Sequence, residues 1–241
     1  MQPNDLEQRL SRISTMWTVM RQSPPAGAEA PGPGWSLLVE RYLRAAYRYL
    51  LGALRDPDLA EELCQEFALK FVRGDYGRAT PERGRFRDYI RTSLVHLVTD
   101  YHRRRQAAPG PLPEQVPAPT ESAASDAAFL ASWKEELLDR TWAALAEANP
   151  AYHATLASHS EQPELPSPEM AKFLGEQLGR DVTPEWVRKT KQRAHEKFAE
   201  LLLDEVAASL GGADGAELEQ ELKALDLLRY CKTALAKRGK S

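Results

Sequence analysis

The segment from Arg85 to Arg104 combines, on one amphipathic helix, the residue types that bind a polynucleotide. Apolar side chains recur at steps of three and four, the spacing of a core-facing stripe, at Phe86, Tyr89, Ile90, Leu94, Leu97, Val98 and Tyr101. The opposite face carries short or hydrogen-bonding side chains that can approach base edges: Asp88, Thr92, Val95, His96, Thr99 and Arg103. Arginines at both ends of the segment can hold phosphates. An ordinary solvated face, with arginines that complement the helix dipole, explains the same charges without a ligand.

A second basic helix is predicted after Thr183. Ser167-Pro168-Glu169 and Thr183-Pro184-Glu185 share a hydroxyl N-cap, a proline at the first helical position and a carboxylate in the first turn. Leu178 to Asp181 supplies a stop and a turn between them, which is the outline of a helix-turn-helix. We expect seven residues to pack this motif: Met170, Ala171, Leu174, Val187, Ala194, Phe198 and Leu201. The outward side chains predicted to contact duplex DNA are Arg188, Lys189, Gln192 and Arg193.

Composition limits the function classes. The 241 residues carry a net charge of -3, which excludes a uniformly basic coat, so any nucleic-acid binding has to be local. Cys64 and Cys231 are too few and too isolated for a disulfide framework or a zinc site, and we expect both to be packing residues in a reduced compartment. No apolar run is long enough for a membrane span, and the charged N-terminus is unlike a signal peptide. These features predict a cytoplasmic protein without metal or cofactor.

The order of helical and Pro-rich segments predicts an all-α fold with two small helical domains. No stretch has the alternation of a strand. We expect a leader over residues 1–34, a helical domain over 35–106, a flexible Pro-rich linker over 107–127, a helix-turn-helix domain over 128–209 and a helical tail over 210–241. The tail is predicted as one amphipathic helix.

An acidic helix is predicted to start at Asp56-Pro57 and to run to about Val72. If Ala60, Leu63, Phe67 and Phe71 face inward, the side chains that lie outward together are Glu61, Glu62, Gln65, Leu69 and Val72. Apolar groups beside acids on an exposed face indicate a protein partner. An ordinary acidic helix surface is the alternative interpretation.

These residues resemble the extracytoplasmic-function group of bacterial RNA polymerase sigma factors, from about Trp35 to Val206. The family pattern Phe-Arg-x-aromatic-aliphatic, then Asn-x-x-x-Asp and paired arginines, falls on Phe86, Arg87, Tyr89, Ile90, His96, Asp100, Arg103 and Arg104. His96 stands where Asn is usual, which leaves the preferred promoter base open. The family's Ala-Glu-Asp-Leu-x-Gln-Glu run is similar to residues 60–66, with Glu62 in place of Asp.

The helix-turn-helix also fits the resemblance, with Glu169-Met170-Ala171 in place of Glu-Ile-Ala. Residues 186–195 are similar to the family's Thr-Val-Lys-x-Arg-Leu-x-Arg-Ala-Arg, except that Lys191 replaces an aliphatic residue near the packed side. In that family the first domain binds the polymerase clamp and captures the melted promoter element, while the second domain reads the distal element as duplex. The resemblance therefore implies a transcription initiation factor whose partners are core RNA polymerase and promoter DNA.

The resemblance assigns roles to three sets of residues. Those expected to bind polymerase are Glu61, Glu62, Gln65, Glu66 and Leu69. Those expected at the melted element, where aromatic platforms and cations bind unpaired bases, are Tyr76, Arg78, Arg83, Phe86, Arg87, His96, Arg103 and Arg104. Those expected at the distal element are Arg188, Lys189, Gln192 and Arg193. Whether an anti-sigma factor also binds the chain stays open.

Two other interpretations have to be weighed. A helix-turn-helix regulator that acts without polymerase needs neither the acidic helix nor the aromatic basic loop. A helical metalloenzyme is suggested by His195-Glu196, but the zinc-protease pattern needs a second His where Ala199 stands. His153 and His159 are not spaced to share a helix face, and no nucleophile with its base is discernible, so we do not expect an enzyme.

Overall fold

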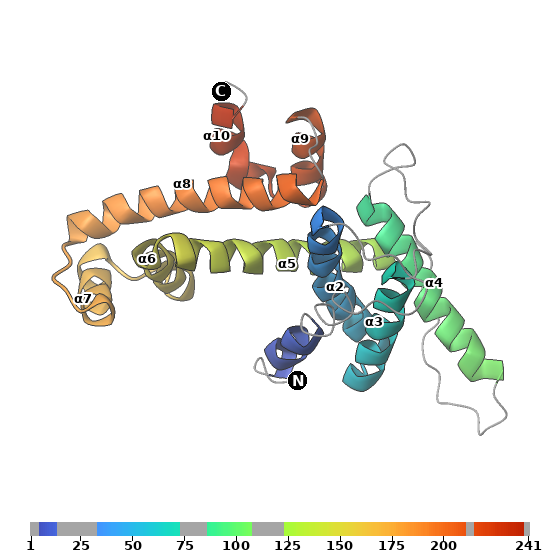
Figure 1. Cartoon of the computed structure of the whole chain (residues 1–241). Helices are drawn as coiled ribbons and strands as arrows, with labels where there is room; N and C mark the ends of the chain where they lie inside the picture. Colours follow the sequence, from blue (N-terminus) through green and yellow to red (C-terminus); the bar gives the residue numbers. More distant parts are fainter. Residues whose placement is uncertain (1–4, 14–32, 73–85, 108–122, 211–214, 239–241) are drawn as a thin grey trace. The chain divides into compact units, whose positions relative to one another are not determined.

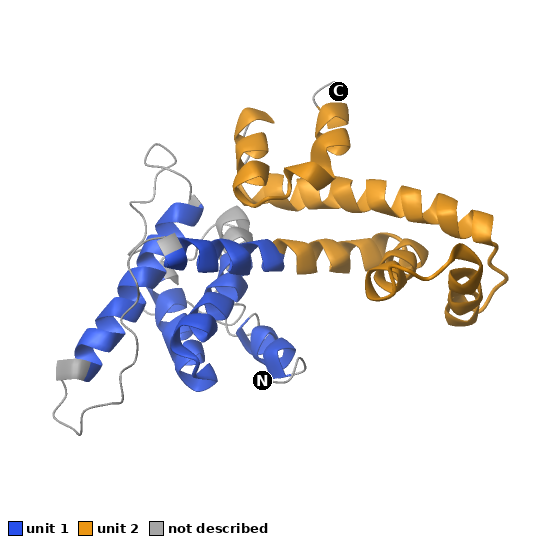
Figure 2. Ribbon diagram, turned by 180° about the vertical axis from the view of Figure 1, so that it is seen from behind, with its two compact units in different colours: residues 1–136 blue, residues 137–241 orange. Residues whose placement is uncertain are grey.

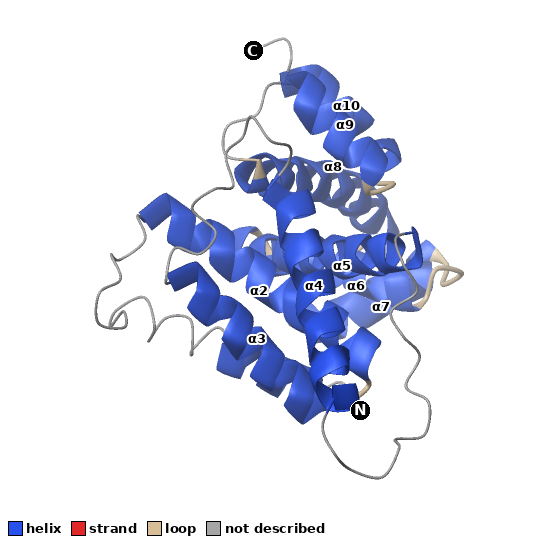
Figure 3. Cartoon of the chain, turned by 90° about the vertical axis from the view of Figure 1, so that its right-hand side faces the viewer, coloured by secondary structure: helices blue, strands red, loops and turns tan. Residues whose placement is uncertain are grey.

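The computed structural model describes residues 5–13, 33–72, 86–107, 123–210 and 215–238. All regular secondary structure within these ranges is helical, as Figures 1 and 3 show, so the predicted all-α class is confirmed. The chain forms two compact units, residues 1–136 and residues 137–241, which Figure 2 distinguishes by colour. None of the described helices is long and apolar enough to cross a lipid bilayer.

Helix α2 (Pro33–Leu54) is the centre of the first unit. It packs against α3 (Pro57–Val72) and α4 (Phe86–Ala107), and α3 and α4 also contact each other. The run from Tyr42 to Leu50 is buried at nearly every position because neighbours cover several faces of this helix. From α4, the predicted core residues Ile90, Leu94, Leu97 and Val98 are buried. The amphipathic interpretation of this helix is therefore correct.

The sharp break between α2 and α3 is produced by the residues at the break itself. Arg55 adopts a left-handed conformation (φ 55°) that ends α2. The Asp56 carboxylate then accepts hydrogen bonds from the backbone N–H groups of Asp58 and Leu59, both at 3.1 Å, and Pro57 occupies the first helical position. The predicted start of α3 at Asp56-Pro57 is confirmed.

Helix α5 (Ala123–Ala148) begins in the first unit and ends in the second. Its first half docks on α2: Trp133 stacks on Tyr42 at 4.3 Å between ring centroids, and Phe129 meets Tyr49 edge to face. The unit boundary between residues 136 and 137 thus lies inside α5, whereas the sequence placed it before residue 128. Large aromatic side chains on both helices produce the difference. Most of the Pro-rich segment, residues 108–122, lies outside the described residues.

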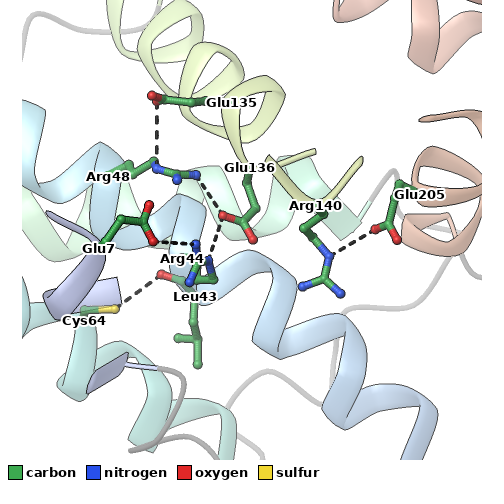
Figure 4. A network of polar contacts seen from close by, with 9 residues as sticks. All are labelled: Glu7, Leu43, Arg44, Arg48, Cys64, Glu135, Glu136, Arg140 and Glu205. Carbon is green, nitrogen blue, oxygen red and sulfur yellow. Dashed lines mark hydrogen bonds and ion pairs between the residues drawn. The ribbon is translucent and has the colours of Figure 1, made fainter. Parts of the chain in front are cut away.

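A buried ionic network reinforces this docking (Figure 4). The Glu136 carboxylate, with no exposed side-chain surface, accepts hydrogen bonds from Arg48 at 2.8 Å and from Arg44 at 3.0 Å. The partly exposed Glu135 lies 3.9 Å from Arg48. Arginine is suited to such a position because its planar fork holds a carboxylate with several donors. The first half of α5 is thus tied to α2 by both rings and charges.

The second unit contains the predicted helix-turn-helix, formed by α7 (Ser167–Leu178) and α8 (Pro184–Ser209) with α6 (Pro150–Glu161) packed on both. Gly179 ends α7 in a left-handed conformation (φ 63°), which glycine adopts without a Cβ penalty. Thr183 caps α8 as predicted, because its hydroxyl accepts from the Trp186 N–H at 3.1 Å. Ser167 is not the cap of α7. Pro166 takes that position without a side-chain hydrogen bond, so the prediction for Ser167 is wrong.

The tail is two helices, α9 (Gly215–Ala224) and α10 (Leu228–Arg238), rather than the single helix predicted. Asp226, left-handed at φ 51°, breaks the helix, and aspartate tolerates this conformation better than most residues. Both helices pack on α8, and Cys231 is buried there while Arg238 bonds Asp204 at 2.8 Å. Cys64 is buried in the first unit, so the prediction of two packing cysteines is confirmed.

Candidate nucleic-acid and polymerase interfaces

The first half of α8 presents a basic face. All four predicted duplex contacts, Arg188, Lys189, Gln192 and Arg193, are exposed. Lys189 is paired with Glu185 at 2.7 Å, and Gln192 donates to Glu196 at 3.3 Å, so both are partly committed within the helix. Among the described residues, Arg188 and Arg193 form no ion pair, which leaves their guanidinium groups available to an anion.

The packing beneath this face fixes its direction. Ala154, Met170, Ala171, Leu174 and Val187 form one buried cluster that joins α6, α7 and α8. Leu145, Leu156 and Ala194 form a second cluster, with the predicted packing residues Phe198 and Leu201 half-buried against it. Arg180, in the turn, lies over the Trp186 ring at 4.7 Å and holds the start of α8 against the turn. The start of α8 is therefore seated on α6, α7 and the turn by these contacts.

On α4 the polar face lies opposite the core as predicted. His96 and Thr92 are exposed, and Thr99 is half-buried. Both threonine hydroxyls donate to a carbonyl of the preceding turn, at 2.9 Å from Thr92 to Asp88 and 2.8 Å from Thr99 to Val95. These hydroxyl oxygens keep their acceptor capacity toward a ligand. The middle of α4 can thus offer an imidazole and hydroxyl groups to a nucleic acid.

The basic end of α4 is open to solvent. Arg103 is 77% exposed and lies 3.5 Å from Asp100, and Arg104 is 62% exposed and lies 3.6 Å from Glu66. Pairs of this kind in solvent are weak and can exchange for a phosphate. Arg105 donates to the Tyr101 hydroxyl at 3.2 Å, which steadies the last turn.

Other predicted strand contacts are placed differently. Arg87 is only 8% exposed, so its guanidinium belongs to the interior of the first unit, and a direct contact with a DNA strand is not supported. In the sequence, Arg87 groups with the arginines at the ends of this segment, which predicted a contact to the DNA strand. Tyr76, Arg78 and Arg83 lie outside the described residues, as does the side chain of Phe86.

The acidic face of α3 contains both exposed residues and residues held in ion pairs. Glu62 and Gln65 are exposed, and Leu69 is half-buried beside them. The Glu61 side chain is 18% exposed, because Arg9 from the helix at residues 5–13 bonds it at 3.1 Å and Arg12 lies 3.7 Å away. Arg9 also bonds Asp58 at 2.9 Å. Glu66 pairs with Lys70 at 3.0 Å. Only Glu62 and Gln65 of the predicted polymerase contacts are fully presented.

One cluster was not foreseen from the sequence. His159 of α6 lines a cleft together with Arg188 and Lys191 of α8, next to the start of α7. Burial and the Lys191 ammonium lower the pKa of His159, while burial, His159 and Lys191 lower that of His195. The one signal in the sequence was Lys191 itself, a charged residue where the pattern favours an aliphatic one.

The metal-site alternative gains no support from the described residues, which include no group of three potential ligands. His153 packs edge to face on Trp142, 5.6 Å between ring centroids, as a core histidine does.

Comparison with known proteins gives one family. Residues 38–108 match Sigma-70 region 2, and this range contains α3, α4 and most of α2. No curated protein and no solved structure matches the chain. The region 2 match coincides with the unit that carries the exposed acidic pair on α3 and the polar and basic face on α4. The match identifies residues 38–108 as a Sigma-70 region 2 domain.

Proposed function

We propose that this chain is a sigma factor of the extracytoplasmic-function type, which recruits core RNA polymerase to promoters and acts without catalysis of its own. The observation that carries the proposal is the presence, in one chain, of a Sigma-70 region 2 domain and of a packed helix-turn-helix in which Arg188 and Arg193 are exposed and form no ion pair with any described residue. A sigma factor needs both, since it holds promoter DNA in duplex and opened form. Its place of action is the cytoplasm, where its polymerase partner and promoter DNA are found.

The helix-turn-helix reads the distal promoter element as duplex. Arg188 and Arg193 are the principal contacts, because they are exposed and carry no ion pair among the described residues. Arginine recognises guanine or phosphate with two parallel hydrogen bonds. Lys189 and Gln192 join them once a phosphate or base edge replaces Glu185 and Glu196 as their partner.

The first unit captures the melted element. His96, Arg103 and Arg104 lie on the exposed side of α4 and supply hydrogen bonds and positive charge. Unpaired bases gain on the order of 1–3 kcal/mol each by stacking on aromatic side chains, a role proposed for Tyr76 and Phe86. Arg78 and Arg83 complete this set as phosphate contacts. Arg87 acts through the interior instead and positions the start of α4.

Polymerase binds the acidic side of α3. Glu62 and Gln65 are the central contacts because they are exposed, and Leu69 adds apolar surface beside them. Glu61 and Glu66 contribute after their present partners move. Exposed acids around a small apolar patch fit a basic helical partner surface on the polymerase.

The deciding experiment measures polymerase and DNA binding separately in two charge variants. The double variant Arg188→Ala, Arg193→Ala should lose run-off transcription from a promoter library while it still retains core polymerase in a pull-down. The variant Glu62→Lys should lose the pull-down and keep duplex binding. A wild-type chain that binds duplex but never retains polymerase would favour the rival function, a helix-turn-helix regulator that acts alone.

A further inference from the structure

The cleft between α6, α7 and α8 is built entirely without acids. Its polar lining is Thr155, His159, Ser167, Arg188 and Lys191, and its remaining lining is proline and apolar side chains. The Thr155 hydroxyl already donates to the Ala151 carbonyl at 2.7 Å. Three of the other four polar side chains are cationic or can become so, and all of them open onto one cleft.

These cations are unpaired. Within the described ranges neither Arg188 nor Lys191 forms an ion pair, although Lys189, Lys197 and Lys223 all do. The charged groups that affect His159 and His195 are likewise cationic, since Lys191 lowers the pKa of both imidazoles. Positive charge gathered without a counter-charge destabilises a fold unless an anion neutralises it.

Lys191 is the residue of the cleft that packing alone does not explain. The position is half-buried on a helix whose neighbours Val187 and Ala194 are in the core, and an aliphatic side chain would pack there without cost. A lysine in its place loses part of its hydration and gains nothing from a carboxylate. Lys191 instead lines the cleft beside His159, where its ammonium group can meet an anion.

We propose that His159, Arg188 and Lys191 form a phosphate-binding cleft that holds one backbone phosphate of duplex DNA beside the recognition helix. The inference rests on the proposed function, because Arg188 belongs both to this cleft and to the face that reads the duplex. The hydroxyl of Ser167, at the start of α7, adds a hydrogen-bond donor to the same cleft. The phosphate anchors the helix, and Arg193 and Gln192 stay free to read sequence.

The test is the salt dependence of binding to a short duplex of arbitrary sequence, measured by fluorescence anisotropy with the full chain. Each phosphate contact contributes about -0.9 to the slope of log affinity against log salt. Lys191→Leu should reduce the magnitude of the slope by about 0.9. The ratio of wild-type to variant affinity should therefore fall by about 3.5-fold between 50 and 200 mM salt. His159→Gln should also weaken duplex binding, and it leaves the side chains of α8 unchanged.

Lys197→Leu is the matched control. It makes the same substitution on α8, at a lysine that pairs with Glu200 at 3.7 Å and does not line the cleft. Its slope should equal that of the wild type. Circular dichroism and the unfolding midpoint verify that each variant is folded. An unchanged slope in a folded Lys191→Leu variant, or an equal loss in Lys197→Leu, overturns the proposal.

Two further arms separate the possible failures. If Arg193→Gln reduces the slope and Lys191→Leu does not, the helix-turn-helix binds DNA without this cleft and only the present inference fails. If the wild type shows no salt-dependent binding at all, the proposed function of the second unit fails with it. Inorganic phosphate is the second probe: an NMR shift of His159 with phosphate but none with duplex would assign the cleft to a free anion and refute the DNA contact.

Discussion

The buried carboxylate of Glu136 gives the sharpest prediction about the first unit. Glu136→Ala leaves Arg44 and Arg48 on α2 without the acceptor that both now share at 3.0 and 2.8 Å (Figure 4). Breaking a buried ion pair from one side costs about 3–5 kcal/mol, because the remaining charge stays desolvated. The Arg44 side chain is 20% exposed and can turn to water, so we expect the lower end, about 3 kcal/mol.

Amide hydrogen exchange, read on peptides from α2 and from the first half of α5, measures this loss where it occurs. A change of about 3 kcal/mol corresponds to a protection factor about 150-fold lower in both helices. Glu135→Ala is the matched control, since Glu135 is 61% exposed and lies 3.9 Å from Arg48. Such a surface pair is worth about 0–1 kcal/mol. If Glu136→Ala lowers protection no more than Glu135→Ala, the network does not hold α5 on α2 and the reasoning is wrong.

Three further changes have defined outcomes. Arg9→Gln should raise the affinity for core polymerase up to about fivefold, because it releases Glu61 and Asp58 from an ion pair worth about 1 kcal/mol at most; unchanged affinity in a binding titration would contradict a competing role for Arg9. Thr183→Ala should destabilise the second unit by about 1 kcal/mol in urea unfolding, whereas Ser167→Ala should have almost no effect because Ser167 caps nothing; equal losses would refute the cap assignment. The pKa values of His159 and His195 lie below the usual 6.5 in the folded chain, so protonation favours the unfolded state. Stability of the second unit is therefore complete above pH 6.5 and is lost as the pH falls below 6.5 toward the lowered values; a double His159→Gln, His195→Gln variant should show a flatter profile, and an equally steep one would exclude the histidines.

Local patterns in the sequence predicted what local physics decides. The start of α3 at Asp56-Pro57 and the cap at Thr183 follow from side chains within three residues of the bonds that they make. The buried stripe of α4 follows from its helical period. The succession of α7, turn and α8 was predictable for the same reason, because each of these helices has its own start and stop signals.

What escaped prediction depends on partners far away in the sequence. Nothing in the sequence near Glu135 and Glu136 distinguishes the two acids, and only Arg44 and Arg48, 92 and 88 positions away, make Glu136 a buried anchor. The burial of Arg87 was likewise not predicted, because nothing near it in the chain signals burial. The division of α5 between two units has the same origin, since the aromatic partners of Phe129 and Trp133 are on α2.

The distribution of ion pairs separates the charges that build the structure from those that can bind a ligand. Arg44, Arg48 and Arg91 each meet a carboxylate of α5 at 3.0 Å or less, and the first two are largely shielded from solvent. Arg188, Lys191 and Arg193 have no such partner among the described residues, although Glu185, Glu196 and Glu200 lie on the same helix. An overall charge of -3 therefore hides a local cluster of positive charge on α8, where the segment from Arg188 to Arg193 contains four Lys or Arg residues and no acid. A protein whose net charge repels DNA can bind DNA only where its cations are not neutralised by its own acids. On α8, Glu185 and Glu200 pair with lysines and Glu196 accepts a hydrogen bond from Gln192, so these acids do not neutralise the arginines. If the acids on α8 instead paired with Arg188 and Arg193, both arginines would already be neutralised. The double variant Arg188→Ala, Arg193→Ala would then show little change in DNA affinity.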